Sequence, residues 1–274
     1  LVRDKNSCRT LLGSSLLLFG LVGLLVALLK LTNSALSLYG SENAAGHRHS
    51  LIRLGDGILL NKPTVLANGD WLLPASVWKA DNSIRVYAST DQGKTFQLRG
   101  TANVLPPESR GPDEPMIVER KDSSLWMMVR RQGMAETFSH DGGKTWSPVE
   151  RSPLRHATAR FFLRRLRSGK LLLVKHGPLR ERTAREKLMA YVSDDDGKTW
   201  QGGLMIDQRK GVTYPDGVQA DDGTIYIIYD YRRTPVGAVL MATFTEDDVR
   251  AGKPVTDKVR LRVEISRLQR ESDK

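Results

Sequence analysis

Three copies of one eight-residue pattern, Ser-x-Asp-x-Gly-x-Thr-(Trp/Phe), do most to limit the folds open to this chain. The copies are STDQGKTF from Ser89, SHDGGKTW from Ser139 and SDDDGKTW from Ser193. The shared Asp can accept hydrogen bonds from nearby backbone amides, the shared Gly can adopt a positive φ, and the aromatic residue can pack beneath the turn. We name each copy an Asp box after its shared residue, which is Asp91, Asp141 or Asp195. We predict that these three residues are structural and hold hairpin turns.

The additional acids of the third Asp box do not indicate a metal site. Asp194 and Asp196 flank the shared Asp there, but Thr and Gln hold those positions in the first box, and His and Gly hold them in the second. A calcium loop would need its oxygen ligands kept in all copies. The five histidines and the single Cys8 form no zinc-ligand pattern. We therefore expect no metal and no cofactor.

Four longer segments repeat the order of an apolar strand, a tight polar turn and a second apolar strand. Their turns are Asn68-Gly69, Asp122-Ser123, Ser168-Gly169 and Asp222-Gly223. The turns lie 54, 46 and 54 residues apart, counted from 68 to 122, to 168 and to 222. A third strand follows each hairpin, and in three cases its last Ser begins an Asp box that leads to a fourth strand.

Four strands about every 50 residues is the spacing of β-propeller blades. Only TEDDVRAGK from Thr245, with a capping Thr and a final Gly-Lys, reads as a short helix. The sequence therefore predicts an all-β fold, a β-propeller with four recognisable four-stranded blades.

Composition permits a large folded domain and favours anionic partners. The chain has 274 residues, 40% of them hydrophobic and 27% charged, and its formal net charge is +11. Nucleic acid is one possible partner for such a charge and an anionic carbohydrate is another. The basic residues are spread along the chain, and no stacking platform or recognition helix is evident. We expect an acidic glycan or sugar as partner and no nucleic acid.

The N-terminal segment differs in kind from the rest. Residues 11–29 carry no charge over nineteen positions, with Arg3, Lys5 and Arg9 before them and Lys30 after them. Such a stretch suits a membrane anchor or a long signal-peptide core, and either would place the remainder outside the cytoplasm. Since the chain begins with Leu, an artefact of the sequence record is a third reading. We divide the chain into residues 1–50, this segment and its linker, and residues 51–274, the propeller.

The Asp boxes, the blade spacing and the tract VTYPDGVQADDGTIYIIYD from Val212 together resemble the sialidase (neuraminidase) superfamily, especially its bacterial BNR-repeat members. The resemblance runs from about Leu54 to about residue 265. It implies a sialidase-type propeller of six blades, so that one or two N-terminal blades would be missing here. Asp boxes by themselves say little about activity, since they also occur in propellers that only bind proteins.

The resemblance also implies roles for four residues. Glu114, in PDEPMIVER, is similar to the family's buried Glu, and Arg130 sixteen positions later to one of its carboxylate-binding arginines. Arg185, in REKL, is similar to a second such arginine. Tyr214, in TYPDG, is similar to the tyrosine nucleophile. Guanidinium groups can grip a sugar carboxylate bidentately, and a neutral phenol is not repelled by that carboxylate as an acid would be.

Two parts of the family's site have no counterpart in this sequence. These are a third arginine near the start of the propeller and an Asp that serves as acid and base. The leucine-rich segment and its linker occupy the region that would carry them. An unclosed ring would also leave strand edges bare. We therefore expect weak or no hydrolase activity from the isolated chain.

The leading functional hypothesis is an exo-acting, retaining glycoside hydrolase for a terminal acidic sugar, sialic acid or a relative. A non-catalytic propeller that binds carbohydrate or protein is one alternative. A polysaccharide lyase on a propeller scaffold is another, because abstraction of a proton beside a uronate carboxylate could also use Arg and Tyr. Convergence of Arg130, Arg185 and Tyr214 on one site is the observation that would favour the hydrolase.

Overall fold

The computed structural model describes residues 54–77, 82–103, 114–234 and 237–268. The chain divides into two units, Leu1–Gly57 and Ile58–Lys274, and the sheets that the structure describes belong to the second. Among the described residues, no helix is both long and apolar enough to cross a membrane. The apolar stretch of residues 11–29 lies outside the described residues.

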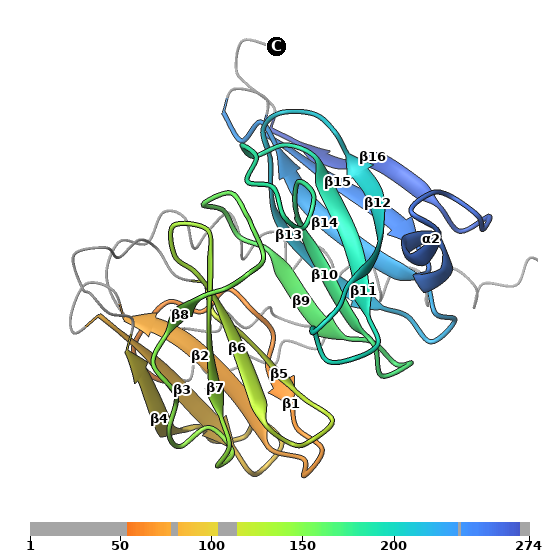
Figure 1. Ribbon diagram of the computed structural model, residues 1–274. Helices are drawn as coiled ribbons and strands as arrows, with labels where there is room; N and C mark the ends of the chain where they lie inside the picture. The colour runs from red at the N-terminus through yellow and green to blue at the C-terminus, as the bar shows by residue number, and fades with distance from the viewer. Residues whose placement is uncertain (1–53, 78–81, 104–113, 235–236, 269–274) are drawn as a thin grey trace, which may run out of the picture. The chain divides into compact units, whose positions relative to one another are not determined.

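The described part of the second unit contains four antiparallel sheets, each of four strands that pair in chain order (Figure 1). The first sheet consists of β1 (Thr64–Val65), β2 (Trp71–Val77), β3 (Ser83–Ser89) and β4 (Gln97–Asn103). The second consists of β5 (Met116–Glu119), β6 (Leu125–Arg130), β7 (Met134–Ser139) and β8 (Glu150–Arg151).

The third and fourth sheets repeat this plan. The third consists of β9 (Phe162–Arg165), β10 (Leu171–His176), β11 (Leu188–Ser193) and β12 (Gln201–Asp207). The fourth consists of β13 (Val212–Gln219), β14 (Ile225–Tyr231), β15 (Ala238–Phe244) and β16 (Arg260–Arg267). All four predicted hairpins are present as the first two strands of a sheet, and the sheets are the blades of a β-propeller. The predicted all-β fold class is therefore confirmed.

The number of blades in the structure differs from the number that the resemblance implied. The resemblance implied six blades with the first one or two missing, whereas the described residues form four. Neither the six blades nor the loss of N-terminal blades is confirmed. The sequence repeat registers only the hairpins that a chain contains, and it detects four of them.

The first strands of the blades lie next to one another. The Thr64 hydroxyl donates to the Ile117 carbonyl oxygen at 2.7 Å and joins β1 to β5. The Leu163 amide lies 3.2 Å from the Met116 sulfur and joins β9 to β5. Lys62, just before β1, forms an ion pair of 2.8 Å with Asp216 of β13. These contacts hold the four first strands in one neighbourhood.

The core lies between neighbouring blades, and β6 shows how one strand serves two cores. Leu125, Met127 and Val129 belong to a buried cluster shared with the first blade. Trp126 and Met128 belong to the other cluster, which extends through the third and fourth blades. Successive side chains of a strand point to opposite faces, so alternate residues of β6 enter different cores. All of these side chains are at most 2% exposed.

The predicted short helix is also present, as α2 (Glu246–Ala251). The Thr245 side chain and Asp248 form a reciprocal capping box at its start, and Gly252 ends it with a φ of 67°. Asp248 also accepts hydrogen bonds from the backbone amides of Val255 at 2.7 Å and Thr256 at 2.8 Å. This helix therefore anchors the chain that leads into the last strand.

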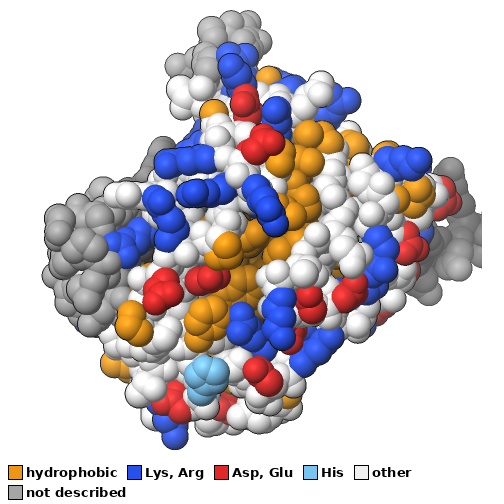
Figure 2. Space-filling view, viewed as in Figure 1, with side chains coloured by type: hydrophobic (Ala, Val, Ile, Leu, Met, Phe, Trp, Pro, Cys, Tyr) orange, Lys and Arg blue, Asp and Glu red, His pale blue; other side chains and the backbone are white. Residues whose placement is uncertain are grey.

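Lys and Arg side chains are dispersed over the surface. Figure 2 shows them across one face with acidic side chains between them and a band of apolar side chains running through the middle. This distribution fits the sequence, in which basic residues occur along the whole chain.

Candidate active site

The three Asp boxes have the same network of hydrogen bonds. In each, the Ser hydroxyl donates to the Asp Oδ1, at 2.7 Å for Asp91 and 2.8 Å for Asp141 and Asp195. The Thr hydroxyl donates to the other oxygen of the same Asp at 2.6 Å in all three. These hydrogen bonds lower the pKa of each Asp, in the case of Asp195 to about 2. The shared carboxylates are thus engaged within their turns.

Glu114 and Arg130 face each other at the end of the β5–β6 hairpin. Because Met116 pairs with Met128 in antiparallel register, Glu114, two residues before Met116, lies opposite Arg130, two residues after Met128. Glu114 Oε2 lies 3.4 Å from Arg130 Nη1, and both side chains are at most 5% exposed. The sixteen-residue spacing noted in the sequence is therefore the length of a hairpin.

Burial raises the pKa of Glu114 above its ordinary value of 4.5. Four neighbours act against that rise, in decreasing order the charges of Arg130 and Arg160, the phenol of Tyr214 and the charge of Arg185. The four residues selected from the sequence, Glu114, Arg130, Arg185 and Tyr214, thus interact in one region although they come from three blades.

An irregularity in the pairing of β13 determines the position and backbone conformation of Tyr214. Thr213 pairs with Asp230 and Asp216 with Ile228, so two residues of β13 face one residue of β14. Tyr214 is one of these two, and its φ is 52°. Such bulges redirect side chains, and a positive φ in a residue other than Gly costs about 1 kcal/mol or more. The backbone of Tyr214 is therefore in an unfavourable conformation that its neighbours have to stabilise, and the side chain it carries is half-buried.

Arg185 lies in the connection between β10 and β11 and is exposed. Its Nη2 donates to the Thr158 carbonyl oxygen at 3.1 Å. Its charge acts on Glu114, on Asp230 and on His176. Burial lowers the pKa of His176 to about 4, so this ring is neutral near pH 7.

Arg160, Asp230 and Arg233 also belong to this region, and sequence reasoning did not select them. Arg160 is fully buried and donates to Leu60 O at 2.8 Å and to Asn61 Oδ1 at 2.7 Å, while its Nε and Nη1 have no hydrogen-bond partner among the described residues. Arg233 Nε lies 2.9 Å from Asp230 Oδ2. For Arg160 and Asp230 the usable signal was a charged residue beside an apolar run, in ATARFF (157–162) and IYIIYD (225–230).

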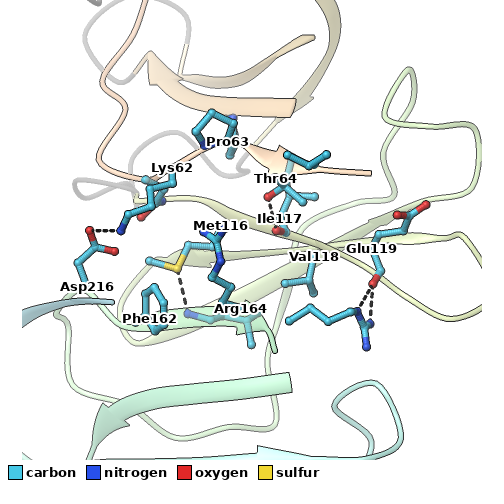
Figure 3. A pocket seen from close by; sticks show the side chains of 15 residues that line it. Lys62, Pro63, Thr64, Met116, Ile117, Val118, Glu119, Phe162, Arg164 and Asp216 are labelled. Atoms are coloured by element: carbon cyan, nitrogen blue, oxygen red, sulfur yellow. Dashed lines mark hydrogen bonds and ion pairs between the residues drawn. The ribbon is translucent and has the colours of Figure 1, made fainter. Parts of the chain in front are cut away.

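A pocket of about 170 Å³ lies among the first strands of the blades. Met116 to Glu119 and Phe162 to Arg165 line it, together with residues before and within β1 (Figure 3). At one end Lys62 reaches Asp216, two residues beyond Tyr214. Arg160 Nη2 lies 3.7 Å from the same Asp216, so a charged junction connects this pocket to the segment that carries Tyr214.

Among the described residues, no group of three or more His, Cys, Asp or Glu side chains has a geometry suited to a metal ion. The region before Leu54, where the resemblance would put a third arginine and an acid/base Asp, lies outside the described residues.

The fold and the cluster together define a β-propeller that gathers several guanidinium groups, a phenol and a buried carboxylate at one place. A family model described as BNR repeat-like domain matches residues 51–227. The chain therefore belongs to the BNR repeat-like domain family. No curated protein matches it in sequence.

Several solved structures share the fold. The intramolecular trans-sialidase from Ruminococcus gnavus, in complex with oseltamivir carboxylate, aligns with a TM-score of 0.55 and 18% identity over 69% of this chain and 44% of its own. The leech intramolecular trans-sialidase, complexed with 2,7-anhydro-Neu5Ac, aligns with 0.53 and 17% over 69% of this chain and 31% of its own. The α-L-arabinanase from Penicillium chrysogenum, complexed with arabinobiose, gives 0.52 and 16% over 77% and 67%. At these identities the likeness concerns the fold, and this chain spans 44% of the R. gnavus structure.

Proposed function

We propose that this protein is a sialidase-like exo-glycoside hydrolase that acts on a terminal acidic sugar, sialic acid or a related sugar, with retention of configuration. The observation that carries the proposal is the set of interactions around Glu114. This buried carboxylate pairs with Arg130 at 3.4 Å and is influenced by Tyr214 and Arg185 from two other blades. The fold shared with two trans-sialidases and an arabinanase agrees with a sugar as ligand.

Arg130 and Arg185 differ in exposure, and we assign them different roles. Arg185 is exposed, and in this proposal its guanidinium fork makes the first contact with the sugar carboxylate. Arg130 is buried against Glu114 and serves mainly to keep that carboxylate charged. In this proposal Arg130 also binds the substrate carboxylate, together with Arg185.

Tyr214 and Glu114 supply the nucleophile and its base. The Tyr214 phenol oxygen attacks the anomeric carbon as Glu114 takes the phenolic proton, and the bond to the leaving oxygen breaks. The leaving oxygen acquires a proton from a group that we do not assign. Water then attacks the anomeric carbon from the face that the leaving group vacated, opposite Tyr214, and gives its proton to the unassigned group. The carbon–Tyr214 bond breaks, Glu114 returns the proton to the phenolate, and the sugar leaves with its original configuration. A neutral phenol suits this task because it approaches the anionic sugar without charge repulsion.

The test uses the purified chain and a panel of 4-methylumbelliferyl sugars: N-acetylneuraminic acid, glucuronic acid and galactose. In keeping with the weak activity expected from the sequence, we expect slow release from an acidic sugar and none from the neutral one, with the anomeric configuration of the substrate retained in the first product by proton NMR. Tyr214→Phe and Glu114→Gln should each reduce kcat/KM by about 10²- to 10⁴-fold. Tyr226→Phe, a half-buried tyrosine of β14, is the matched control and should leave release unchanged.

Other outcomes identify the alternatives. Binding of the acidic sugar without release, unaffected by Tyr214→Phe and Glu114→Gln, would indicate a binding propeller. Ultraviolet absorbance from an unsaturated uronate product would indicate a lyase. Absence of both binding and turnover for every acidic sugar in the panel would refute the proposal.

A further inference from the structure

Arg233 lies over the ring of Tyr214. Its Cζ is 4.3 Å from the ring centroid. The same guanidinium pairs through Nε with Asp230 Oδ2 at 2.9 Å and donates from Nη2 to Thr213 Oγ1 at 3.4 Å. One side chain therefore contacts Tyr214, the residue before it, and the residue that pairs with Thr213 across the sheet.

These contacts occur where Tyr214 needs support. The bulge and the φ of 52° place this residue in a backbone conformation that is unfavourable by itself. Thr213 is buried, the Asp230 side chain is only 13% exposed, and both lie at the edge of the bulge, so a group bound to both is fixed in position. The Arg233 side chain is 37% exposed, which leaves one side of it on the surface of the site.

We propose that Arg233 is a positioning residue for Tyr214: through its ion pair with Asp230 it holds the phenol ring in the orientation required for attack. The inference rests on the proposed function, because it concerns the residue assigned there as nucleophile. A planar guanidinium suits this role since it can stack on a ring while its edge hydrogen-bonds a carboxylate. A lysine can provide the positive charge, but it has no planar group that could stack on the ring.

The electrostatics of Asp230 agree with this arrangement. Burial raises the pKa of Asp230 above its ordinary value, while Arg233 and then Arg185 oppose the rise. Its Oδ1 has no hydrogen-bond partner within the part of the chain that the structure describes. The Asp230 carboxylate therefore depends on Arg233, and the removal of Arg233 alone leaves a poorly compensated buried charge.

The test reads the ring of Tyr214 directly, by fluorine NMR of the full chain labelled with 3-fluorotyrosine. The Tyr214 resonance is assigned as the one lost in Tyr214→Phe. We expect Arg233→Met to shift and broaden this resonance and Arg233→Lys to shift it less. Arg232→Met is the matched control, because Arg232 is the exposed neighbouring arginine, and it should leave the resonance in place.

Arg233→Met combined with Asp230→Asn removes the uncompensated carboxylate, so this double variant provides the measurement if Arg233→Met alone does not fold. An unchanged Tyr214 resonance in the folded Arg233 variants would overturn the proposal. That outcome requires no substrate, so it can be told apart from a failure of the proposed hydrolase activity.

Kinetics separate positioning from substrate binding. With the acidic sugar that the chain hydrolyses, we expect Arg233→Met to lower kcat by about 10- to 100-fold with little change in KM, because a misplaced nucleophile reacts slowly once the sugar is bound. Arg233→Lys should recover part of kcat. A raised KM with unchanged kcat would overturn the inference and make Arg233 a binding residue.

Discussion

Glu114 Oε2 lies 3.4 Å from Arg130 Nη1, in a position where neither side chain is more than 5% exposed. A buried carboxylate so close to a single guanidinium is balanced between two opposing effects, burial and charge. Because the net effect is a raised pKa, the balance favours burial.

We predict that the raised pKa of Glu114 controls the acid side of the activity profile. The base must be ionised, so kcat/KM should fall as the pH drops through a pKa that lies above the ordinary 4.5. Arg130→Met removes the largest opposing charge and should move this acid limb to higher pH. The measurement is kcat/KM across the acid range for both proteins. A limb that stays in place in Arg130→Met would show that another group controls it.

Arg185→Lys should weaken binding of the acidic sugar more than it slows the chemistry. Lysine keeps the charge but loses the bidentate fork, and we expect KM to rise by about 10-fold with a smaller change in kcat. Arg182→Lys is the control. Arg182 donates to the Thr158 hydroxyl, whereas Arg185 donates to the Thr158 carbonyl oxygen. Equal effects of the two variants would contradict the role proposed for Arg185.

Ser123→Gly should stabilise the protein. Three of the four blade hairpins place Gly at a positive φ in their turn, and the second has Ser123 there with a φ of 64°. Glycine removes this strain, so we expect the free energy of unfolding to rise by about 0.5–1 kcal/mol, measured from urea denaturation. Ser124→Gly should have the opposite sign, since it removes the hydrogen bond of 2.6 Å from the Ser124 hydroxyl to Asp122.

The Asp boxes should make the fold sensitive to acid. Hydrogen bonds lower the pKa of Asp195 from 3.8 to about 2. A lowered pKa in the folded state means that the stabilisation is present above the unfolded value and is lost as the pH falls from about 4 toward 2. Asp195→Asn should lower the Tm by several degrees near pH 7 and flatten the dependence of Tm on pH in this window. Asp194→Asn, which removes an exposed ion pair with Arg250 and otherwise affects a 3.4 Å hydrogen bond from Gln201, should change the Tm little.

The strands of the fold were predictable because their signals are local. Turn residues such as Asn68-Gly69 and Asp222-Gly223 mark hairpins without reference to any other part of the chain. The Glu114–Arg130 pair was also within reach of the sequence, since both residues sit at the open end of one hairpin. The same local signals predicted four blades, and the described residues form four, whereas the six blades implied by the resemblance are not confirmed, since ring closure depends on packing between segments far apart in sequence.

The support around Tyr214 was not predicted from the sequence for the same reason. Arg233 follows β14 in a polar stretch, and its place over the ring depends on a bulge in another strand. Arg160 stands beside an apolar run, yet its partners Leu60 and Asn61 lie about one hundred residues earlier. The side chains that bear the chemistry carry a family pattern, whereas those that hold them in place carry none.

The alternation along β6 has a consequence for how the protein comes apart. Met127 and Met128 are adjacent in sequence and both fully buried, yet they belong to separate clusters. Peeling the second sheet away would therefore expose two hydrophobic layers at once, which makes stepwise detachment costly and ties the melting of neighbouring blades into one cooperative event.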